Sequence, residues 1–204
     1  MADIAADRAF ADAFVPEDDT IEAAREAADR FGIDAVSPAA GALLALVAAT
    51  CGPASAIVEI GTGTGVSGLW LLKGAPDAQL TSIDADLDLH QVARAVFAAA
   101  RPTRTVRLIT GDAGAVLPRM NEHAYDLVFL DADGEAVRAH VDQALRLVRP
   151  GGSVLVAHVL QEPGRQTRAE QDALHDLLET VRGDPTLLAG VLPVGDGVLH
   201  IVRR

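Results

Sequence analysis

Residues 56–67 read Ala-Ile-Val-Glu-Ile-Gly-Thr-Gly-Thr-Gly-Val-Ser, and this stretch decides the fold. It begins as a short apolar run rich in β-branched residues, breaks into alternating glycines, and enters an apolar segment of helical period from Val66 to Leu72. This succession predicts a strand, a tight glycine loop and a helix, the opening unit of a nucleotide-binding α/β fold. Glycines let the backbone turn sharply and approach a ligand, which the free N–H groups of the helix start then face.

Downstream of this unit, strand and helix patterns alternate. The expected strands cover residues 55–60, 79–83, 105–110, 125–130, 153–157, 187–194 and 197–203. The helix patterns between them cover residues 65–74, 87–100, 113–120, 135–148 and 169–182. Gly195-Asp196 joins the last two strands, which is typical of a hairpin. We predict an α/β, Rossmann-like fold: a seven-stranded, mostly parallel sheet whose antiparallel last strand lies at the edge, with helices on both faces and extra N-terminal helices.

Two helices are predicted before the first strand. We expect Thr20 to cap a helix from Ile21 to Phe31, and Ser37 to cap an almost wholly apolar helix over residues 38–50. Residues 1–204 are predicted to form a single domain, in which residues 1–52 are a helical lid or dimer segment and residues 53–204 a cofactor-binding core.

The composition limits the partners and the compartment. The chain has 17 Lys and Arg against 29 Asp and Glu, a formal net charge of -12. This argues against nucleic acid or an anionic membrane as partner, since phosphate contacts need clustered basic residues. The single Cys51 excludes an intramolecular disulfide and favours a buried position at a helix end. Because the sequence shows neither a signal peptide nor a membrane-spanning run, we expect a cytoplasmic protein.

Acidic side chains follow the expected strands. In open α/β sheets, ligands bind beyond the carboxyl ends of the strands. Those ends carry Glu59, Asp84, Asp112, Asp131 with Asp133, and His158. Clustered carboxylates repel one another, so we expect a cation, a metal or a hydroxyl-rich ligand among them. Asp84 lies 23 residues after Gly61, the usual interval for an acid that binds ribose hydroxyls.

Glu59 discriminates between cofactors. Gly63, Gly65 and Gly68 fit the pattern G-x-G-x-x-G, which is weak by itself. A carboxylate two residues before Gly61 would repel a pyrophosphate, and it would attract the ammonium and sulfonium charges of S-adenosylmethionine. We therefore favour S-adenosylmethionine over a nicotinamide cofactor, and either of them over a glycine turn without a ligand.

Six segments together carry a resemblance. They read Ser-Pro-Ala-Ala-Gly-Ala-Leu-Leu at 37–44, Val-Glu-Ile-Gly-Thr-Gly-Thr-Gly-Val-Ser-Gly-Leu-Trp-Leu at 58–71, Thr-Ser-Ile-Asp-Ala-Asp at 81–86, Tyr-Asp-Leu-Val-Phe-Leu-Asp-Ala-Asp at 125–133, Leu-Arg-Leu-Val-Arg-Pro-Gly-Gly at 145–152 and Leu-Pro-Val-Gly-Asp-Gly-Val at 192–198. With these segments the chain resembles class I S-adenosylmethionine-dependent O-methyltransferases, in particular the bacterial, actinobacterial-type relatives of catechol and caffeoyl-CoA O-methyltransferases. The resemblance covers the chain from about residue 20 to its end and implies a homodimer.

The resemblance also implies a role for each matching position. Glu59 would bind the amino group of the cofactor's methionine part, Ser67 its carboxylate, and Asp84 the ribose hydroxyls. The other cofactor positions would be Val36, Gly61, Thr62, Gly63, Ala85, Asp112 and Ala113. Asp131 would lie between cofactor and acceptor.

The acceptor half of the site departs from the family. In the family, the residue at the position of Asp131 is one of three ligands of a divalent cation, and this cation lowers the pKa of the acceptor hydroxyl. The other two ligands, an adjacent Asp-Asn, are replaced by Ala157 and His158, and a lysine three residues after Asp131 is replaced by Gly134.

Several interpretations of the active centre remain open. His158 could act as general base, oriented by Asp131. Alternatively, Asp131, Asp133 and His158 could hold a rearranged metal site. We favour the metal-free interpretation, because Mg²⁺ prefers oxygen-rich sites. His158 could also be inert, and Asp133 could simply cap a helix.

The sequence thus predicts an S-adenosylmethionine-dependent O-methyltransferase that methylates a small hydroxylated, aromatic or catechol-like acceptor. The alternative is an S-adenosylmethionine-binding protein with little or no catalysis, since the metal ligands and the lysine are changed. A nicotinamide oxidoreductase is the third possibility.

Overall fold

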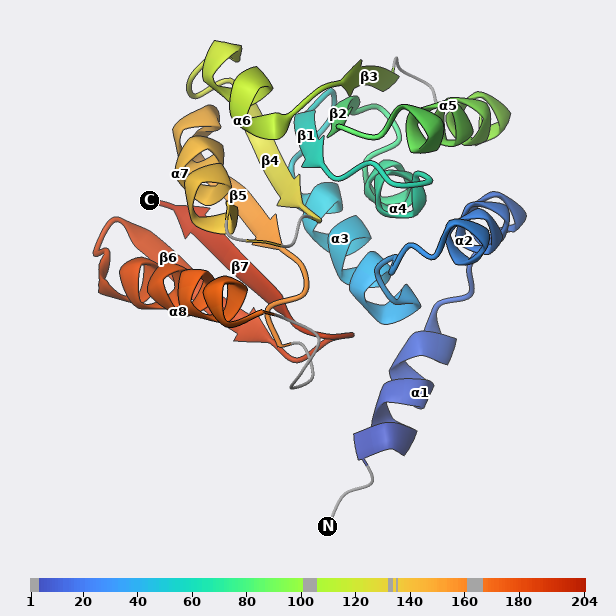
Figure 1. The fold of residues 1–204 in the computed structure, drawn as a ribbon, viewed down its shortest axis with the longest axis horizontal. Helices are drawn as coiled ribbons and strands as arrows, with labels where there is room; N and C mark the ends of the chain where they lie inside the picture. Colours follow the sequence, from blue (N-terminus) through green and yellow to red (C-terminus); the bar gives the residue numbers. More distant parts are fainter. Residues whose placement is uncertain (1–3, 101–105, 132–133, 135, 161–166) are drawn as a thin grey trace.

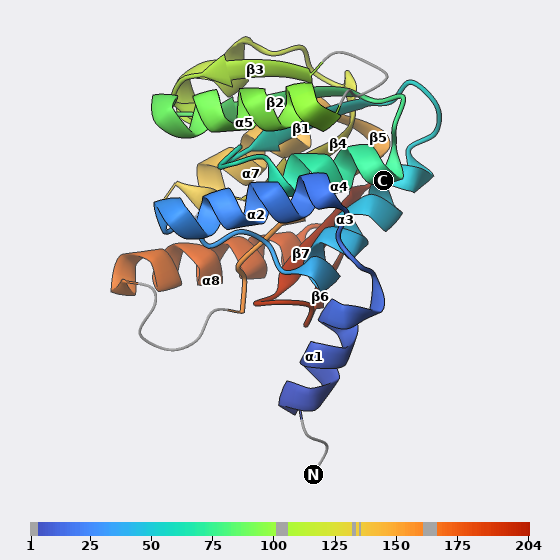
Figure 2. The same cartoon turned by 90° about the vertical axis from the view of Figure 1, so that its right-hand side faces the viewer.

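The computed structural model describes residues 4–100, 106–131, 134, 136–160 and 167–204. Asp133 lies outside the described residues, as do the first residue of the strand expected from 105 and the first residue of the helix expected from 135. In the described part of the chain, one sheet is covered by helices on both faces (Figures 1 and 2).

Seven strands of the described chain form this sheet, in the order β3-β2-β1-β4-β5-β7-β6. They are β1 Ala56–Ile60, β2 Gln79–Asp84, β3 Val106–Thr110, β4 Tyr125–Leu130, β5 Val148–Val156, β6 Leu187–Leu192 and β7 Val198–Arg203. Strands β1 to β5 pair in parallel, whereas β7 runs antiparallel to both β5 and β6. The predicted mostly parallel sheet with an antiparallel last strand is confirmed.

We predicted that the reversed strand would lie at the edge of the sheet, and this was wrong. The reversed strand β7 lies between β5 and β6. The burial of the two hairpin strands agrees with this order. Val198, Leu199 and Ile201 of β7 are buried, whereas residues 188–191 of β6 are exposed. β7 has a neighbouring strand on each side, and β6 is the edge strand with one neighbour.

Helices pack on the sheet in two layers, except α1, which contacts α3 and projects away from the sheet (Figure 2). They are α1 Ile4–Phe14, α2 Asp19–Phe31, α3 Pro38–Thr50, α4 Val66–Gly74, α5 Leu87–Ala100, α6 Ala113–Val116 with the 3-10 turn η1 Leu117–Arg119, α7 Val137–Leu147 and α8 Arg168–Gly183. One core cluster joins α2 to α5 to residues such as Ile57 and Phe129, and the other joins α7 and α8 to residues such as Val58 and Val128. Alternate residues of the central strands thus enter opposite layers, and both faces are buried.

The element boundaries follow local capping chemistry. Ser37 caps α3 as predicted, because its hydroxyl accepts a hydrogen bond from the N–H of Ala40 at 3.3 Å. The predicted cap Thr20 is wrong: Asp18 has the extended backbone of an N-cap, and its carboxylate accepts two amides of the first turn of α2. β5 starts at Val148, earlier than predicted, because residues 149–152 continue the strand.

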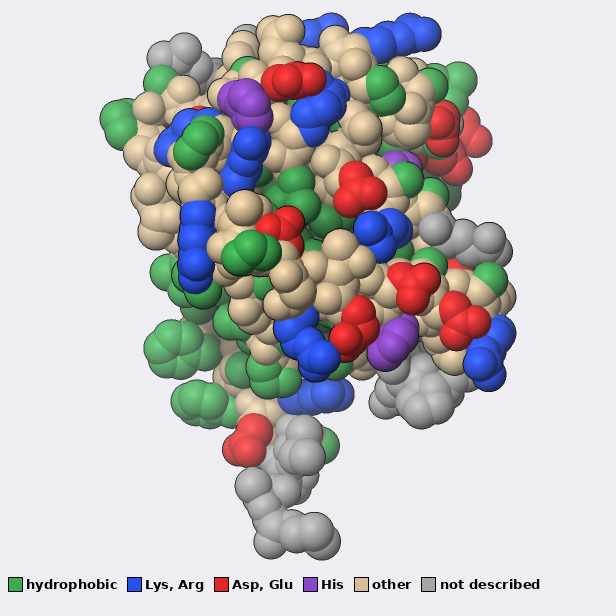
Figure 3. Space-filling model, turned by 90° about the vertical axis from the view of Figure 1, so that its left-hand side faces the viewer, with side chains coloured by type: hydrophobic (Ala, Val, Ile, Leu, Met, Phe, Trp, Pro, Cys, Tyr) green, Lys and Arg blue, Asp and Glu red, His purple; other side chains and the backbone are tan. Residues whose placement is uncertain are grey.

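The surface helices α7 and α8 lie on a face where acidic and basic side chains are interspersed (Figure 3). Arg138 pairs with Asp142 at 3.5 Å, and Arg182 pairs with Glu179 at 2.9 Å. Exposed pairs of this kind contribute little stability.

Within the described ranges, every helix is too short or too polar to span a bilayer.

Two glycines allow α3 and α4 to pack closely. A Cβ on Gly41 would lie 2.3 Å from Nε1 of Trp70, and a Cβ on Gly74 would lie 1.9 Å from the carbonyl oxygen of Ala45. Trp70 is buried in the core, and its Nε1 donates a hydrogen bond to Glu17 Oε1 at 3.2 Å. This hydrogen bond links the segment between α1 and α2 to α4, the helix that follows the glycine turn.

We predict that Gly41→Ala and Gly74→Ala each lower the free energy of unfolding, because the α3–α4 contact has no room for a methyl group. Overpacking of this kind costs about 1–3 kcal/mol, which urea denaturation can measure. Gly183→Ala is the matched control, since nothing lies within 4 Å of a Cβ added there. Equal stability of the Gly74→Ala and Gly183→Ala variants would contradict the packing argument.

Candidate active site

The carboxyl ends of the parallel strands meet at one edge of the sheet. Hydrogen bonds continue the pairing beyond the strands: the N–H of Gly61 donates to the carbonyl of Ile83 at 2.9 Å, and that of Asp131 to the carbonyl of Ile60 at 2.8 Å. The N–H of Ala157 continues the pattern against β4. The residues that follow β1, β2, β4 and β5 are therefore brought side by side, where open α/β sheets bind ligands.

The glycine turn depends on positive backbone angles. Gly61, Gly63 and Gly65 have φ values of 88°, 51° and 97°, a region that favours glycine. A Cβ on Gly61 would lie 2.1 Å from the carbonyl oxygen of Asp131, so the turn packs directly on the segment after β4. On its other side, the hydroxyl of Thr64 donates to a main-chain carbonyl of α2 at 2.8 Å. The predicted sharp turn is confirmed.

Glu59 is fully buried near the end of β1. The hydroxyls of Ser67 and Ser82 donate to its carboxylate at 2.7 and 2.5 Å. Burial raises the pKa of Glu59 to about 8; the two serine hydrogen bonds oppose this, and the charges of Asp131 and Asp84 add to it. The side chain therefore carries a proton at neutral pH, and a cationic ligand would favour its ionised form.

Ser82 is a site residue that sequence reasoning missed. It pairs with Glu59 in the register of β1 and β2, and its hydroxyl also lies 2.6 Å from that of Thr62. The available signal was the polar pair Thr81-Ser82 in an otherwise apolar strand. That signal identifies Ser82 only when the register of the two strands is known.

Asp84 ends β2 beside the glycine turn. Its carboxylate accepts hydrogen bonds from the N–H groups of Gly63 and Asp86, both at 2.8 Å. The acid predicted to bind ribose thus lies against the turn, followed by the exposed Ala85.

The remaining predicted cofactor positions take part in local structure. Val36 is buried, and its carbonyl accepts a hydrogen bond from Arg25 at 2.9 Å. Asp112 follows β3 and caps α6 by accepting the N–H of Ala115 at 3.0 Å, and Ala113 is buried. Because β3 lies two strands away from β1, these two residues stand at a distance from Glu59.

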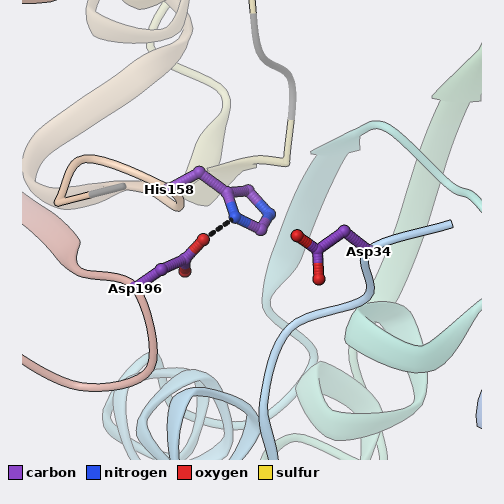
Figure 4. A group of neighbouring side chains, drawn as sticks. All are labelled: Asp34, His158 and Asp196. Atoms are coloured by element: carbon purple, nitrogen blue, oxygen red, sulfur yellow. Dashed lines mark hydrogen bonds and ion pairs between the residues drawn. The ribbon is translucent and has the colours of Figure 1, made fainter. Parts of the chain in front are cut away.

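His158 lies after β5 between two carboxylates. Its Nε2 is 2.7 Å from Asp131 Oδ1, and its Nδ1 is hydrogen-bonded to Asp196 Oδ2. Figure 4 shows the bond to Asp196, and also the carboxylate of Asp34 on the other side of the ring. His158 is buried and has a φ of 61°, which is unusual for a residue other than glycine.

These contacts make His158 a cation. An ionised carboxylate only accepts hydrogen bonds, so a ring bonded to one at each nitrogen carries a proton on both. Burial alone would lower the pKa of His158, but the hydrogen bonds and charges of Asp131 and Asp196 raise it to about 11. Asp196 was not predicted as a site residue, because its place beside His158 arises from the pairing of β7 with β5.

The residues present do not fit the metal site that the resemblance implies. Ala157 has no ligand atom, and both ring nitrogens of His158 already face carboxylates. Possible metal-ligand atoms of Asp34, His158 and Asp196 lie within 4.8 Å of one another. In this group the protonated ring of His158 already takes the place of a cation between the carboxylates. The alternative metal site with Asp133 includes a residue outside the described ranges.

Comparison with known proteins places the chain among relatives. A family model described as O-methyltransferase matches residues 16–204. A protein of Mycobacterium avium (strain 104), named "Putative O-methyltransferase", is 43% identical over 203 residues, which cover 96% of this chain and 90% of that protein.

Solved structures are similar over nearly the whole chain. The O-methyltransferase TomG from Streptomyces achromogenes, in complex with S-adenosylmethionine, has a TM-score of 0.84 at 27% identity and covers 98% of this chain and 96% of its own. An O-methyltransferase from Bacillus cereus, in complex with S-adenosylhomocysteine, has a TM-score of 0.84 at 25% identity and covers 98% and 97%. With the family model matching from residue 16 to the last residue, the resemblance seen in the motifs is confirmed, and the chain belongs to the O-methyltransferase family.

Proposed function

We propose that this chain transfers a methyl group from S-adenosylmethionine to a hydroxyl of a small, aromatic or catechol-like acceptor, and that it does so without a divalent metal. The buried Glu59 beside the glycine turn carries the proposal, because an acid there suits a ligand with an ammonium group. The bound molecules in the Streptomyces achromogenes and Bacillus cereus relatives support the same cofactor.

Three of the proposed cofactor contacts come from β1, from the start of α4 and from the end of β2. The methionine amino group would meet Glu59, its carboxylate would meet Ser67, and the ribose hydroxyls would meet Asp84. The remaining proposed contacts are Val36, Gly61, Thr62, Gly63, Ala85, Asp112 and Ala113.

Asp131 and His158 are the proposed catalytic residues. In methyl transfer, the acceptor oxygen bonds to the methyl carbon while the bond from that carbon to sulfur breaks, and the hydroxyl proton leaves. The charge of His158 favours the ionised form of an adjacent hydroxyl, as a divalent cation does in metal-dependent relatives. We assign Asp131 to receive the proton. This reverses the roles expected from the sequence, because His158 donates from both nitrogens.

Residues 1–52 are proposed to cover the acceptor and to contact a second copy of the chain. A hollow of about 390 Å³ lies between α1, the start of α3 and the turn before β7, where Ala39 and Gly195 line it. Asp12 fastens α1 to α3 by accepting the N–H of Ala39 at 3.0 Å. Phe10 and Phe14 are exposed, and their rings lie 6.1 Å apart, an apolar surface that a second subunit would bury.

We predict that S-adenosylmethionine binding releases about one proton at pH 7, because Glu59 is protonated without a ligand and ionises beside the ammonium group. Below its pKa of about 8, the affinity should therefore rise with pH, by about tenfold per unit between pH 6 and 7. Isothermal titration in buffers of different ionisation enthalpy measures both effects.

Glu59→Gln provides the control, since it retains the shape; its amide oxygen can accept from one serine hydroxyl, and its NH₂ group can donate to the other. Its affinity should be lower and independent of pH over the same range. A wild-type protein that binds S-adenosylmethionine without proton release would contradict the assigned role of Glu59. Tight NAD binding without S-adenosylmethionine binding would overturn the proposed cofactor.

A second prediction concerns His158. His158→Gln should lower the turnover number by about 100-fold or more while leaving the S-adenosylmethionine affinity within about threefold, because the ring lies at the acceptor end of the site. The measurement is release of S-adenosylhomocysteine with catechol and related phenols, in parallel reactions without addition, with EDTA and with Mg²⁺. His175→Gln, on an exposed position of α8, is the matched control.

The outcomes separate the open alternatives. Unchanged turnover of His158→Gln would make His158 inert. Turnover that EDTA abolishes and Mg²⁺ restores would refute metal independence. Cofactor binding without turnover on any phenol would favour the weakly catalytic or non-catalytic binding protein.

A further inference from the structure

The turn between β6 and β7 reaches the active site through the sheet topology. Because β7 runs antiparallel to β5, with Val156 opposite Leu199, the start of β7 lies beside the end of β5. The residues just before β7 are therefore brought next to His158. In a wholly parallel sheet this turn would lie elsewhere.

The main chain fixes the turn against the segment that follows β5. The N–H of Leu160 donates to the carbonyl of Asp196 at 2.7 Å, and the N–H of Val159 donates to the carbonyl of Gly197 at 3.2 Å. Gly197 has a φ of 96°, and a Cβ on it would lie 2.5 Å from Cγ of Leu160. These contacts are made by main-chain atoms and use no atom of the Asp196 carboxylate.

The carboxylate of Asp196 instead determines how the imidazole lies. It accepts the Nδ1–H of His158, which turns Nε2 toward Asp131 Oδ1 at 2.7 Å. An imidazole without a partner at Nδ1 can rotate about its Cβ–Cγ bond and lose the contact at Nε2. The ring is buried, and the carboxylate of Asp34 lies on its other side (Figure 4).

We propose that Asp196 is a positioning residue for methyl transfer: by holding Nδ1 of His158, it directs the Nε2–H toward Asp131 and the acceptor. The inference rests on the proposed function, in which His158 and Asp131 act on the acceptor hydroxyl. Asp196 acts through His158, as outer partners of catalytic groups do in other enzymes.

The test compares Asp196→Ala and Asp196→Asn with wild type in the full chain, with Asp172→Asn at an exposed position of α8 as the matched control. Asp196→Ala should lower the turnover number on catechol by about 10–100-fold, with S-adenosylmethionine affinity within about twofold. Asp196→Asn should recover part of the loss, because its amide oxygen still accepts the Nδ1–H. Asp172→Asn should match wild type.

A spectroscopic readout separates positioning from general loss of structure. In histidine ¹⁵N-labelled protein, with the His158 signals assigned from His158→Gln, the ring N–H signals of His158 should shift or broaden in Asp196→Ala and be partly restored in Asp196→Asn. Unchanged His158 signals in both variants would overturn the proposal, as would unchanged turnover in both. If Asp196→Ala does not fold, Asp196→Asn decides by the same measurements. If the wild type methylates no phenol, the proposed function fails, and the ring signals still decide whether Asp196 positions His158.

Discussion

The site depends on the direct contact between the glycine turn and the segment after β4. The Cα of Gly61 packs so close to the carbonyl of Asp131 that a methyl group would come within 2.1 Å of the oxygen. This contact lies between β1 and β4, where the chain, after extending the sheet through β2 and β3, crosses to the other side of β1. Open α/β sheets bind their ligands at such a switch point. Beyond the strand pairing of β1 with β4, Gly61 therefore brings the glycine turn into direct contact with the segment that carries Asp131.

The cofactor half and the acceptor half differ in how they manage charge. On the β1 side, burial and neighbouring acids keep Glu59 protonated between two serine hydroxyls. On the β5 side, carboxylates on both ring nitrogens keep His158 positively charged. Glu59 is thus a neutral acid that can ionise when a cationic ligand binds beside it. His158 is itself the cation on the β5 side. A buried acid and a buried base held in their less usual protonation states at one sheet edge are typical of functional sites.

Much of the fold could be predicted because local patterns determine it. Strand β4 is a nearly unbroken apolar run, and Ser37 is followed by a proline, so the strand and the helix start at Ser37 were both recognised. The place of Asp84 beside the glycine turn agrees with its interval after Gly61. Ser82 and Asp196 could not be predicted, because each becomes a site residue only through pairing between strands: Ser82 through the register of β1 with β2, and Asp196 through the placement of β7 beside β5.

Trp70 gives the protein a built-in optical probe. It is the single tryptophan of the chain, it is buried at Gly41, and it lies on the helix that directly follows the glycine turn. Its indole is hydrogen-bonded to Glu17, and the ammonium of Lys73 lies 4.7 Å from the ring centroid. The tryptophan fluorescence of the whole protein therefore originates at one place, the contact of the N-terminal helices with α4, and its emission spectrum reports whether that contact is closed.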